Sequence, residues 1–164
     1  MALVLDIVRS LRAPRRVIRA LAVTGPREPW LLMVLMLACA LVFVAQWPRL
    51  ARAAQLDPSI PLDARLAGAL FAWVFIAPLF FYGMAALMTL ALRIVGRVPG
   101  ARVRLALFWA LMVASPFLLL QGLVAGVIGP GLQAGLVALV AAGVFLAVLV
   151  AGLRVAVEEP APAA

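Results

Sequence analysis

Few side chains in this chain of 164 residues could do chemistry inside its long apolar stretches. The polar residues within those stretches are Gln46, Tyr82, Thr89, Ser115, Gln121 and Gln133. The acids all lie outside them, at Asp6, Glu28, Asp57, Asp63, Glu158 and Glu159. Proton-coupled membrane transport usually relies on an ionisable side chain at membrane depth. The sequence therefore argues against proton-driven transport.

Histidine and paired cysteines are also missing from the sequence. The chain has no His, and Cys39 is its one cysteine. A Ser-His-Asp triad, a His-ligated haem and a Cys₂His₂ zinc site all need residues that the chain lacks. A lone cysteine among apolar residues is typical of a small packing residue. We therefore expect no catalytic residue, no metal site and no cofactor.

The composition indicates a membrane protein. Hydrophobic residues make up 68% of the chain and charged residues 12%, against about 45–50% and about 25% in soluble domains. A chain of this size cannot bury such an excess in one core. All 14 basic residues are Arg, and the net charge is +8. We expect phospholipid headgroups, and not nucleic acid, to be the anionic partner.

Four stretches are long and apolar enough to cross a hydrocarbon core about 30 Å thick. The predicted spans are about 30–47, 66–92, 105–128 and 132–153. The predicted fold is therefore all-α, a transmembrane helical bundle of four spans in a transmembrane domain of residues 29–154. Residues 48–65 should form the longest connection, with turns at Pro48, Pro58 and Pro61. Residues 155–164 are predicted to be a disordered tail.

Residues 1–28 are predicted to be a basic, amphipathic interfacial helix. Its apolar residues recur at spacings of three and four, at Leu3, Val4, Ile7, Val8 and Leu11. Its lipid-headgroup contacts are predicted at Arg9, Arg12, Arg16 and Arg19. Pro14 should bend this helix or divide it in two. The alternative is that the helix packs against the protein's own bundle.

The distribution of Arg predicts the orientation. Eleven Arg residues fall on the side that holds both termini, and only Arg49, Arg52 and Arg65 fall on the other. Because Arg-rich loops stay in the cytoplasm, we expect both termini there.

Prolines and buried polar groups are the candidate structural or interaction residues of the spans. Pro78 and Pro116 each remove a backbone hydrogen bond at depth, and we expect static kinks there and not hinges. Ser115 is placed to satisfy a carbonyl freed near Pro116. Gln121 needs polar partners, which are either other helices or a bound molecule. Tyr82 is a further polar residue within the second predicted span.

Two GxxxG patterns permit close approach between helices. They are Gly122–Gly126 and Gly131–Gly135. We expect them to pack the last two spans against each other and not to form a homodimer.

The order of features resembles a known family. A basic lead-in at residues 13–19 precedes the first span, and a Gly/Arg loop at residues 95–102 precedes a span with a central Ser-Pro at residues 108–119. Over roughly residues 10–155 this resembles the bacterial members of the Yip1 family of small polytopic membrane proteins. The resemblance implies an α-helical membrane bundle with a cytoplasmic N-terminus. The family generally has five spans, and its eukaryotic members act in vesicle trafficking, a role we do not transfer to a chain without their long N-terminal domain.

We predict a non-enzymatic integral protein of the bacterial inner membrane. Its role would be that of a scaffold or accessory partner, in contact with anionic lipids and other membrane proteins, and the sequence is compatible with a homo-oligomer. The alternative is a small passive transporter or channel. In that case Gln121, Tyr82 and Ser115 would line a polar path between the second and third spans.

Overall fold

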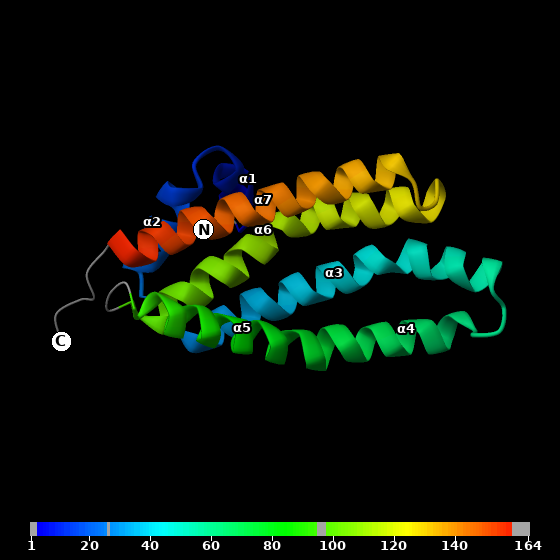
Figure 1. Cartoon of the computed structure of the whole chain (residues 1–164), viewed down its shortest axis with the longest axis horizontal. Coiled ribbons are helices and arrows are strands. Elements are labelled where there is room, and N and C mark those ends of the chain that lie inside the picture. The colour runs from blue at the N-terminus through cyan, green and yellow to red at the C-terminus, as the bar shows by residue number, and fades with distance from the viewer. Residues whose placement is uncertain (1–2, 26, 95–97, 159–164) are drawn as a thin grey trace.

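The protein is helical in a computed structural model that describes residues 3–25, 27–94 and 98–158 (Figure 1). The predicted all-α fold is confirmed over these residues. In chain order the elements are α1 (Leu3–Arg12), α2 (Pro14–Val23), α3 (Glu28–Leu56), α4 (Leu62–Phe71), the π-helical turn η1 (Ala72–Ile76), α5 (Ala77–Leu92), α6 (Gly100–Val127) and α7 (Leu132–Glu158).

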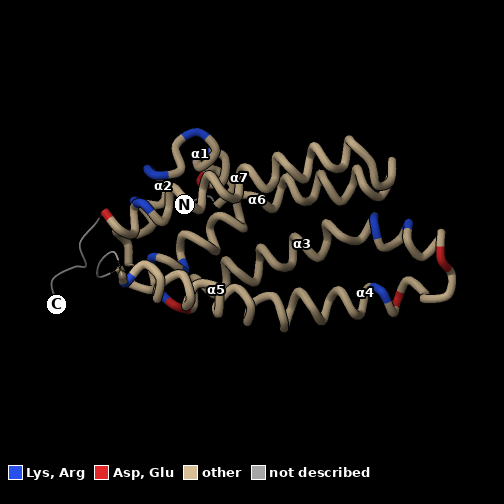
Figure 2. The backbone as a smooth tube through the Cα atoms, in the orientation of Figure 1, with Lys and Arg blue, Asp and Glu red and all other residues tan. Residues whose placement is uncertain are grey.

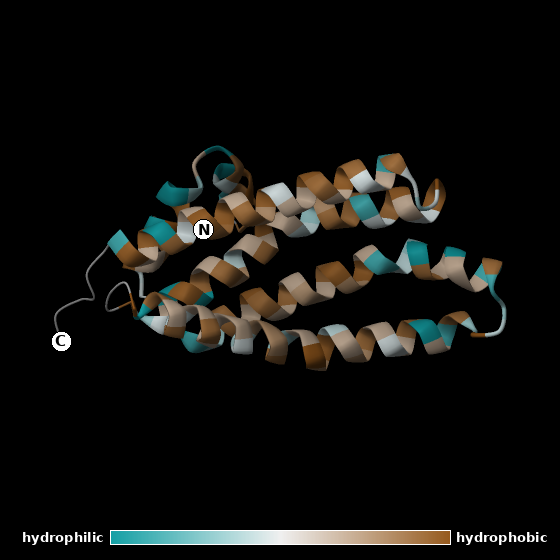
Figure 3. Ribbon diagram, in the orientation of Figure 1, coloured by the Kyte–Doolittle hydropathy of each residue, from teal (hydrophilic) through white to brown (hydrophobic). Residues whose placement is uncertain are grey.

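Within the described residues, four helical segments are long and apolar enough to cross a membrane, as predicted. They are α3, the continuous segment Leu62–Leu92, α6 and α7. The segment Leu62–Leu92 comprises α4, η1 and α5, and we call it the α4–α5 arm. Figure 3 shows that hydrophobic residues dominate the length of these helices between their ends.

Helix α6 lies at the centre of the bundle, between α3 and α7. In its most apolar stretch 67% of the residues are buried, against 6% in that of the α4–α5 arm. Its side chains Phe108, Trp109 and Met112 are fully buried and form the core with Leu31 and Leu35 of α3. The core is therefore built around α6, while the arm lies at the outside of the bundle.

Close backbone contact joins α6 to α3. A Cβ atom added to Gly122 would lie 1.6 Å from the Ala45 carbonyl oxygen, and one added to Gly126 would lie 2.3 Å from Pro48 Cβ. The first GxxxG pattern therefore packs against α3, and our expectation that it serves the α6–α7 hairpin was wrong. Gly135 has no heavy atom within 4 Å of its would-be Cβ, so the second pattern makes no such contact.

Helix α3 continues past Pro48 to Leu56, so the turn expected at Pro48 does not form. Two contacts with α6 explain the extension. Pro48 packs on Gly126, and Arg52 Nη1 donates to the carbonyl oxygens of Gly126 (3.3 Å) and Val127 (3.1 Å). A cation at these unpaired carbonyls also opposes the negative end of the helix dipole.

The chain turns after α3 over residues 57–61, as expected at Pro58 and Pro61, and this turn begins at Asp57. Its Oδ1 accepts hydrogen bonds from the Ser59 hydroxyl (2.5 Å) and the Ser59 backbone N–H (3.1 Å), and Arg65 Nη2 lies 3.1 Å from its Oδ2. The Ser59 hydrogen bonds, helped by Arg65, lower the pKa of the Asp57 carboxyl. These contacts are therefore complete above the ordinary pKa of an aspartate and are lost as the pH falls through the lowered value.

Pro78 and Pro116 are accommodated in different ways. Pro78 is buried and follows η1, whose wider turn relieves the clash of a proline ring with the preceding turn. Pro116 lies inside α6, where it removes the donor that would have reached the Met112 carbonyl. The Ser115 hydroxyl donates to that same Met112 oxygen at 2.8 Å. The predicted role of Ser115 is confirmed.

The C-terminal end of α7 extends to Glu158, further than the predicted end of the fourth span. Arg15 Nη2 of α2 lies 2.6 Å from Glu158 Oε1, which holds this last turn against α2. The predicted disordered tail therefore begins too early at residue 155. Residues 159–164 lie outside the described part of the chain, as do residues 95–97 of the Gly/Arg loop.

Pro14 divides the N-terminal segment into α1 and α2. Both helices lie against α6 and α7 (Figure 1). Val17 and Ile18 are buried there, and a Cβ on Gly152 of α7 would lie 3.1 Å from Ile18 Cδ1. The apolar stripe predicted for α1 divides between two faces. Leu3 and Ile7 pack on the core, whereas Val4, Val8 and Leu11 are exposed.

Candidate functional site

Charged residues lie at the two ends of the bundle and leave its middle uncharged (Figure 2). One end, which we call the Arg-rich end, holds α1, α2, the start of α3, the end of α5, the start of α6 and the end of α7. The opposite end carries Arg49, Arg52, Arg65, Asp57 and Asp63. This separation is what a bundle needs if its middle lies in hydrocarbon.

Glu28 joins three helices at the Arg-rich end. Its Oε2 lies 2.9 Å from Arg104 Nη2 of α6, and its Oε1 accepts a hydrogen bond from the Tyr82 hydroxyl of α5 at 3.0 Å. The Tyr82 ring also meets Phe108 edge-on, with 5.0 Å between the ring centroids. Tyr82 therefore connects the α4–α5 arm to the rest of the bundle.

A second polar contact at this end fixes α1 to the core. The Trp109 indole N–H donates to Ser10 Oγ at 2.9 Å, and the Ser10 hydroxyl donates to the Asp6 carbonyl oxygen at 2.7 Å. Ser10 and Trp109 are both buried. The Trp109 ring stacks on Trp30 of α3, with 6.4 Å between centroids and 19° between planes. Through these contacts Trp109 connects α1, α3 and α6.

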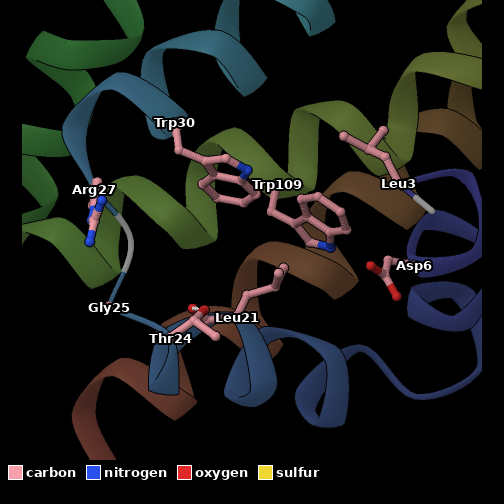
Figure 4. Close-up of a pocket in the computed structure, with 8 residues that line it drawn as sticks. All are labelled: Leu3, Asp6, Leu21, Thr24, Gly25, Arg27, Trp30 and Trp109. Carbon is pink, nitrogen blue, oxygen red and sulfur yellow. Dashed lines mark hydrogen bonds between the residues drawn. The ribbon is translucent and has the colours of Figure 1, made fainter. Parts of the chain in front are cut away.

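Beside the two indoles is a cavity of about 420 Å³, which we call the indole cavity (Figure 4). Its lining residues come from α1, α2, α3, α6 and the α2–α3 connection. They are Leu3, Asp6, Leu21, Thr24, Gly25, Arg27, Trp30 and Trp109. The cavity combines apolar walls with one carboxylate and one guanidinium, the composition of a site for an amphipathic molecule.

Sequence reasoning missed this arrangement, because its residues are distant in the sequence. Ser10 and Trp109 are separated by 99 positions, and Glu28 and Arg104 by 76. One signal was present. Trp30 lies near the start of the first span, as interfacial Trp residues do, and Ser10 is the one uncharged polar residue of α1.

The three residues of the predicted polar path do not lie together. Tyr82 is level with Phe108 on α6, whereas Ser115 and Gln121 follow Phe108 by seven and thirteen residues. At 1.5 Å per residue, Ser115 and Gln121 lie about 10 Å and about 20 Å from Phe108 along the axis of α6. Ser115 is bonded within its own helix. Gln121 is half-buried, and its side chain makes no hydrogen bond within the described ranges.

Replacing Ser115 with Ala tests whether the Ser115 hydroxyl replaces the hydrogen bond that Pro116 removes from α6. Ser115→Ala leaves the buried Met112 carbonyl without a donor, so we expect the free energy of unfolding to fall by about 1 kcal/mol. Unfolding in mixed detergent micelles, followed by circular dichroism, measures this loss. The matched change Ala114→Ser adds a hydroxyl at the adjacent buried position and should not restore stability to Ser115→Ala. Equal stability of Ser115→Ala and the parent would contradict a stabilising hydrogen bond from the Ser115 hydroxyl to the Met112 carbonyl.

The four arginines predicted to contact lipid headgroups are all exposed on α1 and α2. Arg9 Nη1 lies 3.7 Å from Asp6 Oδ1, and Arg19 Nη2 lies 3.7 Å from Glu158 Oε2. At these distances, and with both guanidinium groups exposed, the ion pairs add little stability. The four guanidinium groups therefore lie on the exposed surface of α1 and α2.

No group of three or more His, Cys, Asp or Glu residues that could hold a metal ion is present in the described residues. No protein-family model, curated protein or solved structure matches this chain.

Proposed function

We propose that this protein is a non-enzymatic, multi-pass protein of the bacterial inner membrane and acts as a scaffold or accessory partner in a membrane assembly. The Yip1-like character of the chain and its contact with anionic lipids are parts of the same proposal. The four apolar helices and the uncharged middle of the bundle support the membrane placement.

The outer face of the α4–α5 arm carries this proposal. The arm is long enough for a full span, yet only 6% of its most apolar stretch is buried. Phe71, Phe75 and Leu79 recur every four residues on its outer face and are 57%, 63% and 74% exposed. A stripe of aromatic and aliphatic side chains at helical spacing is suited to packing against a helix of another membrane protein.

The contacts between the arm and the rest of the bundle support the same role. Tyr82, Phe81 and Met84 of α5 contact the core near the Arg-rich end, and Tyr82 reaches Glu28 there. The α4 half has no buried residue. The arm therefore contacts the bundle along one side, through α3 and α6, which leaves its outer face open to a partner.

The N-terminal helices support placement at the cytoplasmic surface. The outward face of α1 combines the exposed apolar residues Val4, Val8 and Leu11 with Arg9 and Arg12. Such a face suits the boundary between headgroups and acyl chains. At the same time α1 and α2 are packed on the bundle, so we propose a fixed interfacial element and not a freely moving helix.

Affinity purification of the full chain in mild detergent tests the proposed function. We expect at least one membrane protein to co-purify with the parent chain. Phe75→Ala with Leu79→Ala should reduce its yield, because both changes remove partner-facing area without touching the core. Leu136→Ala with Leu139→Ala, on exposed positions of α7, is the matched control. A monomer with no co-purifying protein would rule the proposal out.

Reporter fusions test the proposed orientation separately. A reporter after Arg154 should be active in the cytoplasm, and one within residues 55–63 should be active in the periplasm. A periplasmic signal after Arg154 would instead fit the five-span arrangement of the wider Yip1 family and contradict the four-span account.

A further inference from the structure

Two adjoining cavities lie beside the packing of α2 on α7 at the Arg-rich end (Figure 1). Their volumes are about 470 Å³ and about 350 Å³, within the range of about 300–1,000 Å³ for small-molecule sites. Arg15 and Ala151 line both cavities, and we call the two together the α2–α7 groove. Because Val17 and Ile18 of α2 are buried in the core, the walls of this groove are formed before a ligand arrives.

Arginine side chains dominate the lining of the larger cavity. They are Arg12, Arg15, Arg16 and Arg19. The smaller cavity adds Arg154 of α7. Among the described residues, the acid beside these arginines is Glu158, which lies 2.6 Å from Arg15 and 3.7 Å from Arg19. Five arginines beside one acid give the groove a large excess of positive charge, which favours an anionic ligand.

Three of these arginines are available to a phosphate. Arg12, Arg16 and Arg154 are exposed and make no hydrogen bond or ion pair with any described residue. Arg12 and Arg16 line the larger cavity, and Arg154 lines the smaller one. A guanidinium binds a phosphate through two parallel hydrogen bonds. The groove therefore offers two neighbouring places for a phosphate, one in each cavity.

The two places are close to each other. Ala151 borders both cavities, and Arg154 follows it by three residues on α7. At 1.5 Å per residue this separation is about 5 Å along the helix. The three-carbon glycerol link between two phosphates can span such a distance, and the long side chains of Arg12 and Arg16 can adjust to it.

The smaller cavity continues from these charges onto apolar surface of α7. Leu146, Ala147 and Val150 line it and precede Arg154, so they lie nearer the uncharged middle of the bundle (Figure 2). Leu146 is 55% exposed and lies about 12 Å from Arg154 along the helix axis. A free phosphate would leave this apolar surface uncovered. A molecule with phosphates at one end and acyl chains at the other would cover it.

We propose that the α2–α7 groove binds an anionic phospholipid with two phosphates, of the diphosphatidylglycerol type. One phosphate accepts hydrogen bonds from Arg12 and Arg16, and the other accepts them from Arg154. The first methylenes of an acyl chain lie against Leu146 and Val150. This inference rests on the contact with anionic lipids that is part of the proposed function, and it narrows that contact to one site and one class of lipid.

Native mass spectrometry of the full chain tests the site. The protein is released from vesicles that contain equal amounts of diphosphatidylglycerol, phosphatidylglycerol and phosphatidylethanolamine. For the parent chain we expect about ten times more diphosphatidylglycerol adduct than phosphatidylglycerol adduct, since a second charged hydrogen-bonded contact is worth about that factor. Arg154→Gln should make the two adducts about equal, because the second phosphate loses its donor. Arg12→Gln with Arg16→Gln should lower both adducts.

Matched variants separate the groove from general surface charge. Arg27→Gln with Arg93→Gln also removes two exposed arginines at the Arg-rich end, but neither lines the groove, so the adducts should stay at parent levels. Ala147→Phe fills the smaller cavity without a change of charge and should lower the diphosphatidylglycerol adduct. Ala142→Phe, at an exposed position of α7 outside the groove, should not. A free phosphate does not need the apolar surface, so this pair of variants also identifies the acyl-bearing lipid as the ligand.

The outcomes distinguish this site from the proposed function. Equal binding of diphosphatidylglycerol and phosphatidylglycerol by the parent chain would overturn the two-phosphate site and leave the general contact with anionic lipids in place. An unchanged adduct in Ala147→Phe would overturn the site in the same way. Phosphatidylethanolamine binding as strong as that of both anionic lipids would contradict the anionic-lipid contact itself, and with it the part of the proposed function on which the site rests.

Discussion

Gly122→Ala is expected to lower the free energy of unfolding by about 3 kcal/mol. The added methyl group would lie 1.6 Å from the Ala45 carbonyl oxygen, a backbone atom that can move only if α3 shifts away from α6. Overpacking of this kind usually costs about 1–3 kcal/mol, and a rigid backbone neighbour places Gly122 at the upper end. Unfolding in mixed micelles, followed by circular dichroism, measures the change.

Gly135→Ala is the matched control for Gly122→Ala. It is the same substitution in the second GxxxG pattern, where no heavy atom lies within 4 Å of the added group. We expect a gain of about 0.5–1 kcal/mol, because Ala favours a helix more than Gly does. Equal effects of the two substitutions would contradict the close α3–α6 contact.

Trp109→Ala is expected to have a still larger effect, about 4 kcal/mol of lost stability. Truncation of a buried Trp leaves a cavity in the core, and here it also removes the Trp30 stack and the hydrogen-bond donor of Ser10. Without that donor α1 loses its buried polar anchor. Besides the lower stability, we expect faster protease cleavage in the connection between α1 and α2, near Ala13.

Trp109→Phe separates the two roles of Trp109. The smaller ring retains most of the core packing but has no indole N–H, so Ser10 alone is left without its donor. We expect cleavage near Ala13 to increase while most of the stability remains. If Trp109→Ala leaves both stability and cleavage at parent values, the central position of Trp109 in the bundle is wrong.

The sequence predicted the spans well because their signal is local. A run of about 20 apolar residues identifies a membrane helix without knowledge of its neighbours, and the four spans follow in that way. Ser115 could be assigned to the hydrogen bond freed at Pro116 for the same reason, since donor, acceptor and proline share one turn of α6.

Features that depend on two distant helices were not predictable. Pro48 signals a turn when α3 is considered alone, but Arg52 and Gly126 hold the helix through it. Gly122 and Gly126 face α3 and not α7. The GxxxG spacing predicts close packing but does not identify the neighbouring helix. The division of the α1 stripe between core and exterior depends likewise on Trp109, which lies 99 positions from Ser10.

The candidate site was predictable only in part. The sequence identifies Tyr82 only as a polar residue within the second span, and its partner in the structure is Glu28, an acid outside the predicted spans. The polar path through Tyr82, Ser115 and Gln121 was derived from chemical type alone, and the structure spaces these residues along the bundle. The indole cavity combines four helices and a connection, so no sequence pattern marks it.

Site-specific photo-crosslinking in intact membranes is the most direct test of the claim that the α4–α5 arm binds another membrane protein. A photoreactive amino acid at Phe75 should yield a discrete crosslinked product of higher mass. The same residue at Leu139 of α7, which is 69% exposed, should yield none. Crosslinks to lipid alone at both positions would contradict the scaffold role of the arm.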